Sequence, residues 1–488
     1  MSSKSASSKG DHNVNSGETA EKGPGPDPDI DSHAGKAPVN RAKFLDGDLM
    51  RHVIVMSLSS SVGLVSLFLV DFVDLYFISL LGNPALTAAV GFAGTLLFFN
   101  MSITIGLMIA MGALAARRIG GGDEEGAQLI ATSVLALGLV IGVCFAGLFW
   151  TFAPNILGLI GASGEAKLAA TQYLRIVVPA MPIMVIAMVC SGLLRAHGDA
   201  KRAMNSTLSM GITNAILDPI LIFGLSLGLE GAAWASVAAR TAMMFTSLLP
   251  VLRIYGGFAP FQMDRLMGDL RPIMAIAGPA ILTNIASPFG ALVVTRAIAP
   301  YGDLAVAGIA VITRLMPLAY CVIFALSGAV GPIIGQNYGA FAFDRVRETL
   351  LRALQFAGVY TLAAWLVLFL SQGFIASQFG LVGVGKSMLF WFCAVGAPLL
   401  FFNGVLFVTN AACNNLDRPI WSTYLNWGRN TVGIIPFIAV GAAIGGAPGI
   451  VVASYGGAMI FAALGLWLVT RLIRGLEQEY RKDDLKKI

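Results

Sequence analysis

Three carboxylates lie inside long apolar stretches of this 488-residue chain. Asp71 and Asp74 fall in the first stretch and Asp218 falls in the fifth. An ionised carboxylate at the centre of a bilayer costs about 2.5–3.5 kcal/mol or more when nothing compensates its charge. Such residues are therefore candidates for binding a proton or a cation. The alternative interpretation places them at the aqueous ends of their spans.

The depth of two of these acids favours a shared site. Asp74 follows Arg51 by 23 residues, about 34 Å at the helical rise. Asp218 follows Arg202 by 16 residues, about 24 Å. Both stretches are expected to run outward from the cytoplasm, so both acids should lie in the outer half of the membrane.

Two further polar residues share helix faces with these acids. Asn214 precedes Asp218 by four residues, and Asp71 precedes Asp74 by three. An amide can hydrogen-bond a carboxyl group in either protonation state, whereas Asp71 is either a third acid of the site or a rim residue. Because low dielectric and a second acid both favour the neutral form, we predict a cation-coupling site formed by Asp74, Asp218, Asn214 and Asp71. Na⁺ at Asp74 and Asp218 is the alternative to H⁺.

The composition identifies the elements that must position this site. Apolar residues make up 56% of the chain and charged residues only 12%, about half the charged fraction of a soluble protein. Each apolar run exceeds the roughly 20 residues that a membrane helix needs, and none alternates as a barrel strand would. The predicted fold is an all-α polytopic membrane protein. Its twelve spans are expected at 51–80, 92–116, 128–152, 168–194, 203–225, 231–252, 272–298, 304–335, 348–370, 387–412, 420–443 and 450–473.

The distribution of basic residues predicts the orientation. Of the 32 Lys and Arg residues, 25 fall in the two tails and alternate connections, and three fall in the other connections. The remaining four are the in-span arginines Arg175, Arg240, Arg314 and Arg429. This bias places both termini in the cytoplasm.

An internal repeat divides the spans into two halves. Residues 85–121 align with 304–340 at an offset of 219, so that Gly112 matches Gly331 and Gly120 matches Gly339. Six spans in each half predict two bundles related by a pseudo-two-fold axis along the membrane normal, a plan common in secondary transporters. In the second half, the positions that correspond to Asp74 and Asp218 hold neither Asp nor Glu. The ionisable site should therefore lie in the first bundle alone.

The expected domains follow from this division. They are a disordered cytoplasmic tail (1–48), a first lobe (49–255), a cytoplasmic inter-lobe loop (256–271), a second lobe (272–474) and a cytoplasmic C-terminal tail (475–488). The tail composition, rich in Ser, Gly, Asp, Lys and Pro, cannot bury enough apolar surface to fold alone.

Some residues could line a substrate cavity. They are Arg314, Met184, Met188, Asn284 and Phe402; ordinary helix packing is the competing interpretation of the Met and Phe residues. No nucleotide-binding or hydrolase motif occurs in a credible context, and the five cysteines form no CxxC or Cys/His cluster. We therefore expect no enzyme activity, no prosthetic cofactor, no structural metal and no nucleic-acid partner. The expected partners are the bilayer and small amphipathic substrates, bound by a monomer.

Three separated segments of the sequence resemble the multidrug and toxic compound extrusion (MATE) transporters. These segments are Val73 to Gly91, Leu193 to Gly224, and Gly331 to Ala340. The resemblance covers about 50–473. It implies two six-helix lobes and export of amphipathic, often cationic compounds in exchange for H⁺ or Na⁺. It also implies that Asp74, Asn214 and Asp218 form the coupling site of the N-terminal lobe.

The chain departs from the family pattern in two places. Ser59, Ser60 and Ser61 stand where many relatives have a bend-promoting proline, although the repeat partner of that span has Pro279. The second lobe also lacks the acids that some sodium-coupled members use, which favours proton coupling.

The function expected from the sequence is multidrug efflux by a proton-coupled antiporter of a bacterial inner membrane. A lipid-linked oligosaccharide flippase of the same superfamily is the nearest alternative. A membrane-embedded enzyme would need a catalytic constellation, and a channel would need a repeated filter motif; neither pattern is present.

Overall fold

The computed structural model describes residues 42–485, apart from the side chains of Asp71, Phe72, Leu75, Asp484 and Leu485. In this part of the chain twelve helical segments are long and apolar enough to cross a membrane, and there is no strand. The predicted fold class, an all-α polytopic membrane protein, is confirmed. Most of the predicted N-terminal tail lies outside the described residues.

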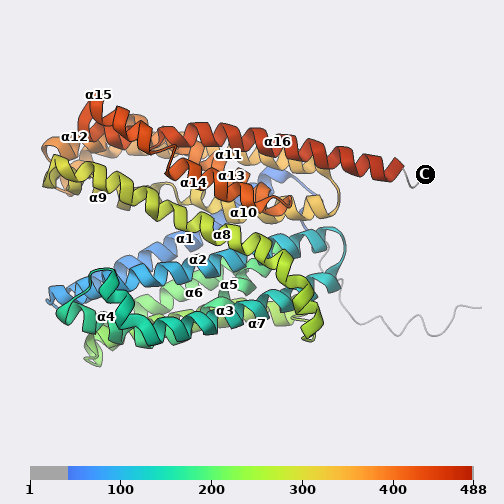
Figure 1. Cartoon of the computed structure of the whole chain (residues 1–488), viewed down its shortest axis with the longest axis horizontal. Helices are drawn as coiled ribbons and strands as arrows, with labels where there is room; N and C mark the ends of the chain where they lie inside the picture. The colour runs from blue at the N-terminus through green and yellow to red at the C-terminus, as the bar shows by residue number, and fades with distance from the viewer. Residues whose placement is uncertain (1–41, 486–488) are drawn as a thin grey trace, which may run out of the picture. The chain divides into compact units, whose positions relative to one another are not determined.

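The first six spans contain helices α1 to α7 (Figure 1). They are α1 (Leu49–Ser79), α2 (Pro84–Gly120), α3 (Glu124–Leu159), α4 (Gly164–Val177) with the 3₁₀ turn Val178–Ala180 and α5 (Met181–Ala196), α6 (Ala200–Pro219) with the π-helical segment Ile220–Gly224, and α7 (Gly228–Ile254).

The second six spans contain helices α8 to α16. They are α8 (Met263–Ile298) with the 3₁₀ turn Ala299–Tyr301, α9 (Asp303–Ala319), α10 (Cys321–Gly339), α11 (Phe343–Gln378), α12 (Gly383–Trp391) with the π-helical segment Phe392–Gly396, α13 (Ala397–Asn415), α14 (Pro419–Asn430), α15 (Ile435–Ala453) and α16 (Gly456–Leu485).

Two of the predicted spans are interrupted by residues that belong to no helix. The span expected at 304–335 consists of α9 and α10, which meet at Tyr320, three residues after Pro317. The span expected at 420–443 is interrupted after α14, before α15 begins at Ile435.

The last inter-span connection was expected between residues 443 and 450, and the helix is broken there. Gly446 separates two helical pieces that together form α15, which ends at Ala453, and the final helix begins at Gly456. Gly446 kinks α15 with φ 58°, a left-handed conformation that glycine adopts without a steric penalty.

Helix α8 contacts both halves of the chain. Its early part packs on the first lobe, where Ser133 Oγ donates a hydrogen bond to Asp269 Oδ2 at 2.7 Å. Its middle contacts the second lobe, where Thr423 Oγ1 donates to the Pro279 carbonyl at 2.8 Å. In Figure 1 α8 accordingly runs between the two groups of helices. Because α8 begins at Met263, part of the segment expected to be an inter-lobe loop is helical.

The two lobes meet at the ends of α2 and α10, on the side predicted to be cytoplasmic. A Cβ atom added to Gly120 would lie 2.0 Å from the Gln336 carbonyl oxygen, and one added to Gly339 would lie 1.9 Å from that of Arg117. Gly120 and Gly339 are equivalent in the sequence repeat, and so are Arg117 and Gln336. The two close approaches are therefore related by the pseudo-two-fold axis.

Polar contacts at the same interface repeat this symmetry. Arg117 Nη2 donates to the Asn414 carbonyl at 3.2 Å, and Gln336 Nε2 donates to the Ala196 carbonyl at 2.7 Å. The first contact joins the end of α2 to the last turn of α13, and the second joins the end of α10 to the last turn of α5. Each contact therefore crosses from one lobe to the other. Gln336 Oε1 also accepts the Phe44 backbone N–H at 2.8 Å. The lobes are thus held together on this side.

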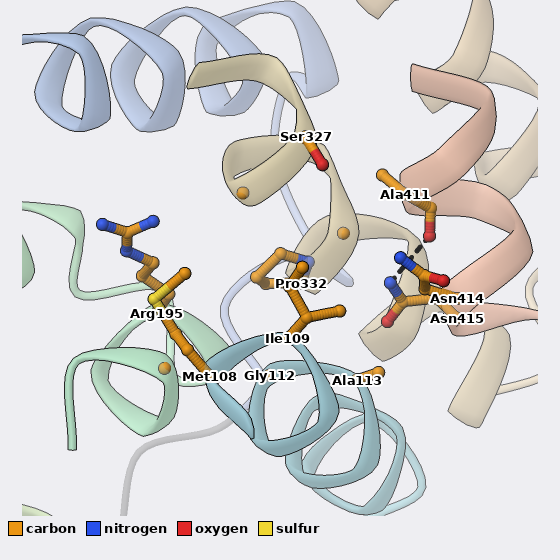
Figure 2. Close-up of a pocket in the computed structure, with 13 residues that line it drawn as sticks. Met108, Ile109, Gly112, Ala113, Arg195, Ser327, Pro332, Ala411, Asn414 and Asn415 are labelled. Atoms are coloured by element: carbon orange, nitrogen blue, oxygen red, sulfur yellow. Dashed lines mark hydrogen bonds between the residues drawn. The ribbon is translucent and has the colours of Figure 1, made fainter. Parts of the chain in front are cut away.

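A small cavity beside these contacts shows how closely the lobes approach. Figure 2 shows Gly112 of α2, Arg195 of α5 and Pro332 of α10 around it, with Asn415 of α13 donating to the Ala411 carbonyl at 2.8 Å. Its volume is about 30 Å³, which is room for about one water molecule. No substrate-sized passage exists at this point.

Candidate cation-coupling site

Asp74 on α1 faces Asn214 and Asp218 on α6, inside the first lobe. Asp218 and Asn214 are fully buried, and Asp74 is only 9% exposed. Asn214 Nδ2 donates to Asp218 Oδ1 at 3.3 Å, as expected for residues four apart on one helix face. Asp74 interacts with both Asp218 and Asn214. The structure therefore brings together three of the four residues that the sequence singled out.

The site has an excess of hydrogen-bond acceptors. One oxygen each of Asp74, Asp218 and Asn214 has no hydrogen-bond partner among the described residues. Two carboxylates in contact cannot both be ionised without a large repulsion in a buried site. A shared proton or a bound cation would relieve this repulsion and satisfy the unpaired oxygens.

The fourth predicted member, Asp71, also belongs to α1. Its side chain lies outside the described residues, so its membership of the site remains a prediction. Within the described part of the chain, no group of three or more His, Cys, Asp or Glu side chains is placed to hold a metal ion.

Asp74 opens onto a cavity of about 410 Å³ within the first lobe. Other polar groups around this cavity are Tyr173 of α4, Asn100 of α2 and Arg240 of α7. Tyr173 Oη lies 3.4 Å from Ser236 Oγ, and Arg240 Nη1 donates to the Val177 carbonyl at 3.1 Å. The cavity therefore places a cationic side chain and a phenol near the carboxylates.

Sequence reasoning did not assign Tyr173 or Arg240 to this site. Arg240 was recognisable as a charged residue within a span, which is a usual indicator of a functional position. Tyr173 had no such signal, because a tyrosine near the end of a span is ordinary. Its proximity to the acids depends on how α4 and α7 pack against α1.

The predicted cavity residues of the first lobe are methionines. Met184 lines the 410 Å³ cavity together with Met101 and Met210. Met188 is buried next to it in a cluster that includes Met184 and Met243. Flexible, polarizable thioethers suit a surface that must adapt to ligands of different shape.

None of the predicted cavity residues of the second lobe lines the cavity that the structure shows in this lobe. Arg314 is exposed on α9, and Asn284 Nδ2 donates within α8 to the Ala280 carbonyl at 2.8 Å. Phe402 packs against Phe401, with ring centroids 5.5 Å apart. A cavity of about 190 Å³ in this lobe is lined instead by the neighbouring Asn403 and by Arg429, among others.

A polar cluster follows α5, outside the membrane-spanning segments. Burial raises the pKa of the Asp199 carboxyl, but hydrogen bonds from Arg202 and Tyr255 outweigh this effect and hold the pKa below its usual value. The Tyr255 hydroxyl donates to Asp199 Oδ2 at 2.7 Å. His197 stacks on Tyr255 with ring centroids 4.3 Å apart, and burial lowers the pKa of His197 to about 4. This cluster joins the α5–α6 turn to the end of α7.

Comparison with known proteins places the chain among transporters. The MatE family model matches residues 60–220 and 279–440, one match in each lobe. A FAD transporter of Shewanella oneidensis is 29% identical over 429 residues, covering 85% of this chain and 93% of the relative. The multidrug export protein MepA of Staphylococcus aureus is 23% identical over 414 residues, covering 84% of this chain and 90% of the relative.

Solved structures show the same fold. The Vibrio cholerae MATE transporter VcmN, determined as a variant, is 23% identical, with a TM-score of 0.83 over 88% of this chain and 97% of that one. The two-lobe architecture, the paired family matches and the twelve spans agree with one another. The chain belongs to the MatE family and is a multi-pass membrane transporter, not an enzyme.

Proposed function

We propose that this protein exports small amphipathic compounds in exchange for protons, by alternating access between its two lobes. Na⁺ is the alternative coupling ion. The observation that carries the proposal is the buried group of Asp74, Asp218 and Asn214, whose unpaired oxygens need a proton or cation. Since Asp74 also lines a cavity, binding of the ion and of a substrate there would be linked.

The basic-residue distribution supports cytoplasmic termini, and the bacterial relatives support a location in a bacterial inner membrane. In that orientation the symmetric contacts of α2 and α10 close the cytoplasmic side, and the coupling site lies in the outer half. Protonation would then occur from outside, and release would follow once the lobes separate at the cytoplasmic face. A monomer suffices for this cycle, because both lobes belong to one chain.

Transport in proteoliposomes tests the proposal. We expect substrate export to follow an imposed proton gradient and not an imposed Na⁺ gradient. Asp74→Asn and Asp218→Asn should each reduce gradient-driven export at least tenfold, because neither amide can take up and release a proton. Asp303→Asn changes an exposed acid at the start of α9 and serves as the control. Wild-type export by both site variants would refute the coupling role.

Two substrate classes have specific support. The acids and methionines of the first-lobe cavity favour lipophilic cations of the kind expected for multidrug efflux. The Shewanella relative, named as a FAD transporter, favours phosphorylated flavins as a second class. The lipid-linked oligosaccharide alternative has no comparable observation in its favour.

A further inference from the structure

We propose that the cavity of the second lobe binds the anionic group of a transported molecule through the guanidinium of Arg429. This inference rests on the proposed export function and adds to it a binding site and a substrate class. The cavity has a volume of about 190 Å³ and lies among α8, α9, α10, α13, α14 and α16. It is separate from the cavity that Asp74 lines.

Arg429 brings an uncompensated positive charge to this cavity. Its Nη1 donates to Asn403 Oδ1, and among the described residues it forms no ion pair with an acid. It lies in the last turn of α14, where the helix carbonyls supply only about half a negative charge. A partly buried guanidinium within a membrane span is costly unless an anion approaches it.

The acids of the second lobe cannot supply that anion. Between residues 272 and 473 they are Asp303, Asp344, Glu348 and Asp417. Asp344 and Glu348 form ion pairs with arginines of α11, and Asp417 forms one with Arg117 of the first lobe. Asp303 is exposed at the start of α9. None of these four residues lines the cavity.

The remaining lining residues indicate the chemistry of the ligand. Phe324 and Phe407 form a tilted pair with ring centroids 5.5 Å apart, offering an aromatic wall. Asn403 and Asn430 bring amide groups to the cavity. The planar fork of arginine matches phosphate and carboxylate oxygens. We therefore expect a planar aromatic ring that carries a phosphate or carboxylate group.

A break in the helix supports a binding role for this position. α14 ends at Asn430, directly after Arg429, and α15 begins only at Ile435. In the first lobe the equivalent span also loses regular helix, since a π-helical segment follows Pro219 just beyond Asp218. Interrupted spans near the centre of a transporter commonly form its binding sites. The repeat thus places an acidic site in one lobe and a basic site in the other, next to comparable breaks.

Binding of three flavins to the purified full-length protein tests this inference. Flavin mononucleotide, 10-carboxymethylflavin and riboflavin share one ring system but carry a phosphate, a carboxylate and no charge, respectively. Equilibrium dialysis without any ion gradient should show at least tenfold tighter binding of one or both anions than of riboflavin. The anion that binds tightly identifies the group that the cavity accepts.

Variants of Arg429 assign this preference to the cavity. Arg429→Gln should abolish the preference for anionic flavins while leaving riboflavin binding within about twofold. Arg429→Lys should keep part of it, because it retains the charge but not the planar fork. Arg474→Gln removes an equal charge from an exposed position on α16 and should change nothing.

Two results would overturn the inference. One is equal affinity of the wild-type protein for charged and uncharged flavins. The other is an equal loss of affinity for all three flavins in Arg429→Gln, which would indicate a structural role. If Arg429→Gln does not fold, the wild-type comparison and Arg429→Lys still decide the question. Because binding is measured without a gradient, a failure of proton coupling would not affect this result.

Discussion

Arg117 at the end of α2 forms an ion pair with Asp417, in the turn after α13, and so joins the two lobes. Asp417 is the repeat equivalent of Asp199, which instead caps α6 within the first lobe. Equivalent acids therefore have different roles: Asp199 stabilises one lobe, and Asp417 connects both. The pair lies beside the close approach of Gly120 and Gly339, where the lobes must part if the transporter opens on this side.

Loss of this ion pair should loosen the closed interface. We expect Asp417→Ala to raise amide hydrogen exchange in residues 108–120 and 331–340 about two- to fivefold, in line with the modest energy of an exposed pair. Hydrogen-exchange mass spectrometry measures this directly.

A charge reversal distinguishes the pair from other effects of the substitution. Exchange should return towards wild type when Arg117→Asp and Asp417→Arg are combined. Glu348→Ala, which breaks an exposed ion pair within α11, is the matched control. Unchanged exchange in Asp417→Ala would show that the pair does not hold the lobes together.

A side chain at Gly120 should prevent the lobes from closing fully. The added Cβ of Gly120→Ala would lie 2.0 Å from a backbone carbonyl oxygen, and backbone cannot move aside as a flexible side chain can. We expect a fall of several degrees in the melting temperature of the detergent-solubilised protein. Gly147→Ala on α3 should be neutral, because a Cβ there meets nothing within 4 Å. Equal melting temperatures for both variants would contradict the close packing of α2 and α10.

Acidification should destabilise the protein through His197. Burial lowers its pKa from 6.5 to about 4, so the folded state disfavours the imidazolium. The stability that the neutral ring contributes is complete above pH 6.5 and is lost as the pH falls towards 4. We expect His197→Gln to lose less thermal stability than wild type over that interval. Parallel curves of melting temperature against pH for the two proteins would exclude this role of His197.

The hydrogen bond between Ser133 and Asp269 should anchor α8 to the first lobe. Both side chains are buried, and Ser133→Ala would leave the Asp269 carboxylate with one hydrogen bond fewer. We expect a loss of about 1–3 kcal/mol in stability, measured by thermal or denaturant unfolding. Ser371→Ala removes only an exposed bond to the Val367 carbonyl within α11 and should cost little. A similar small cost for both substitutions would count against the anchoring role.

Much of the membrane architecture could be predicted from the sequence. Long apolar runs must be helical in lipid, because no water is available to satisfy their backbone groups. The sequence also predicted that Asp74 and Asp218 lie at similar depth in the first repeat, because the helical rise converts residue counts into distance. The repeat itself predicted two lobes and indicated that the second lacks an equivalent acid pair.

The sequence by itself therefore determined the number of spans, the two-lobe plan and three members of the candidate site, because length, apolarity and helical spacing act locally along the chain. The tertiary structure decided the features that depend on packing between helices distant in the sequence. Only the packing brings Tyr173 and Arg240 to the cavity of Asp74, presses Gly120 and Gly339 against opposite lobes, and leaves Arg429 beside a cavity without an acid. These relationships depend on residues that lie far apart in the chain, and no local pattern encodes them.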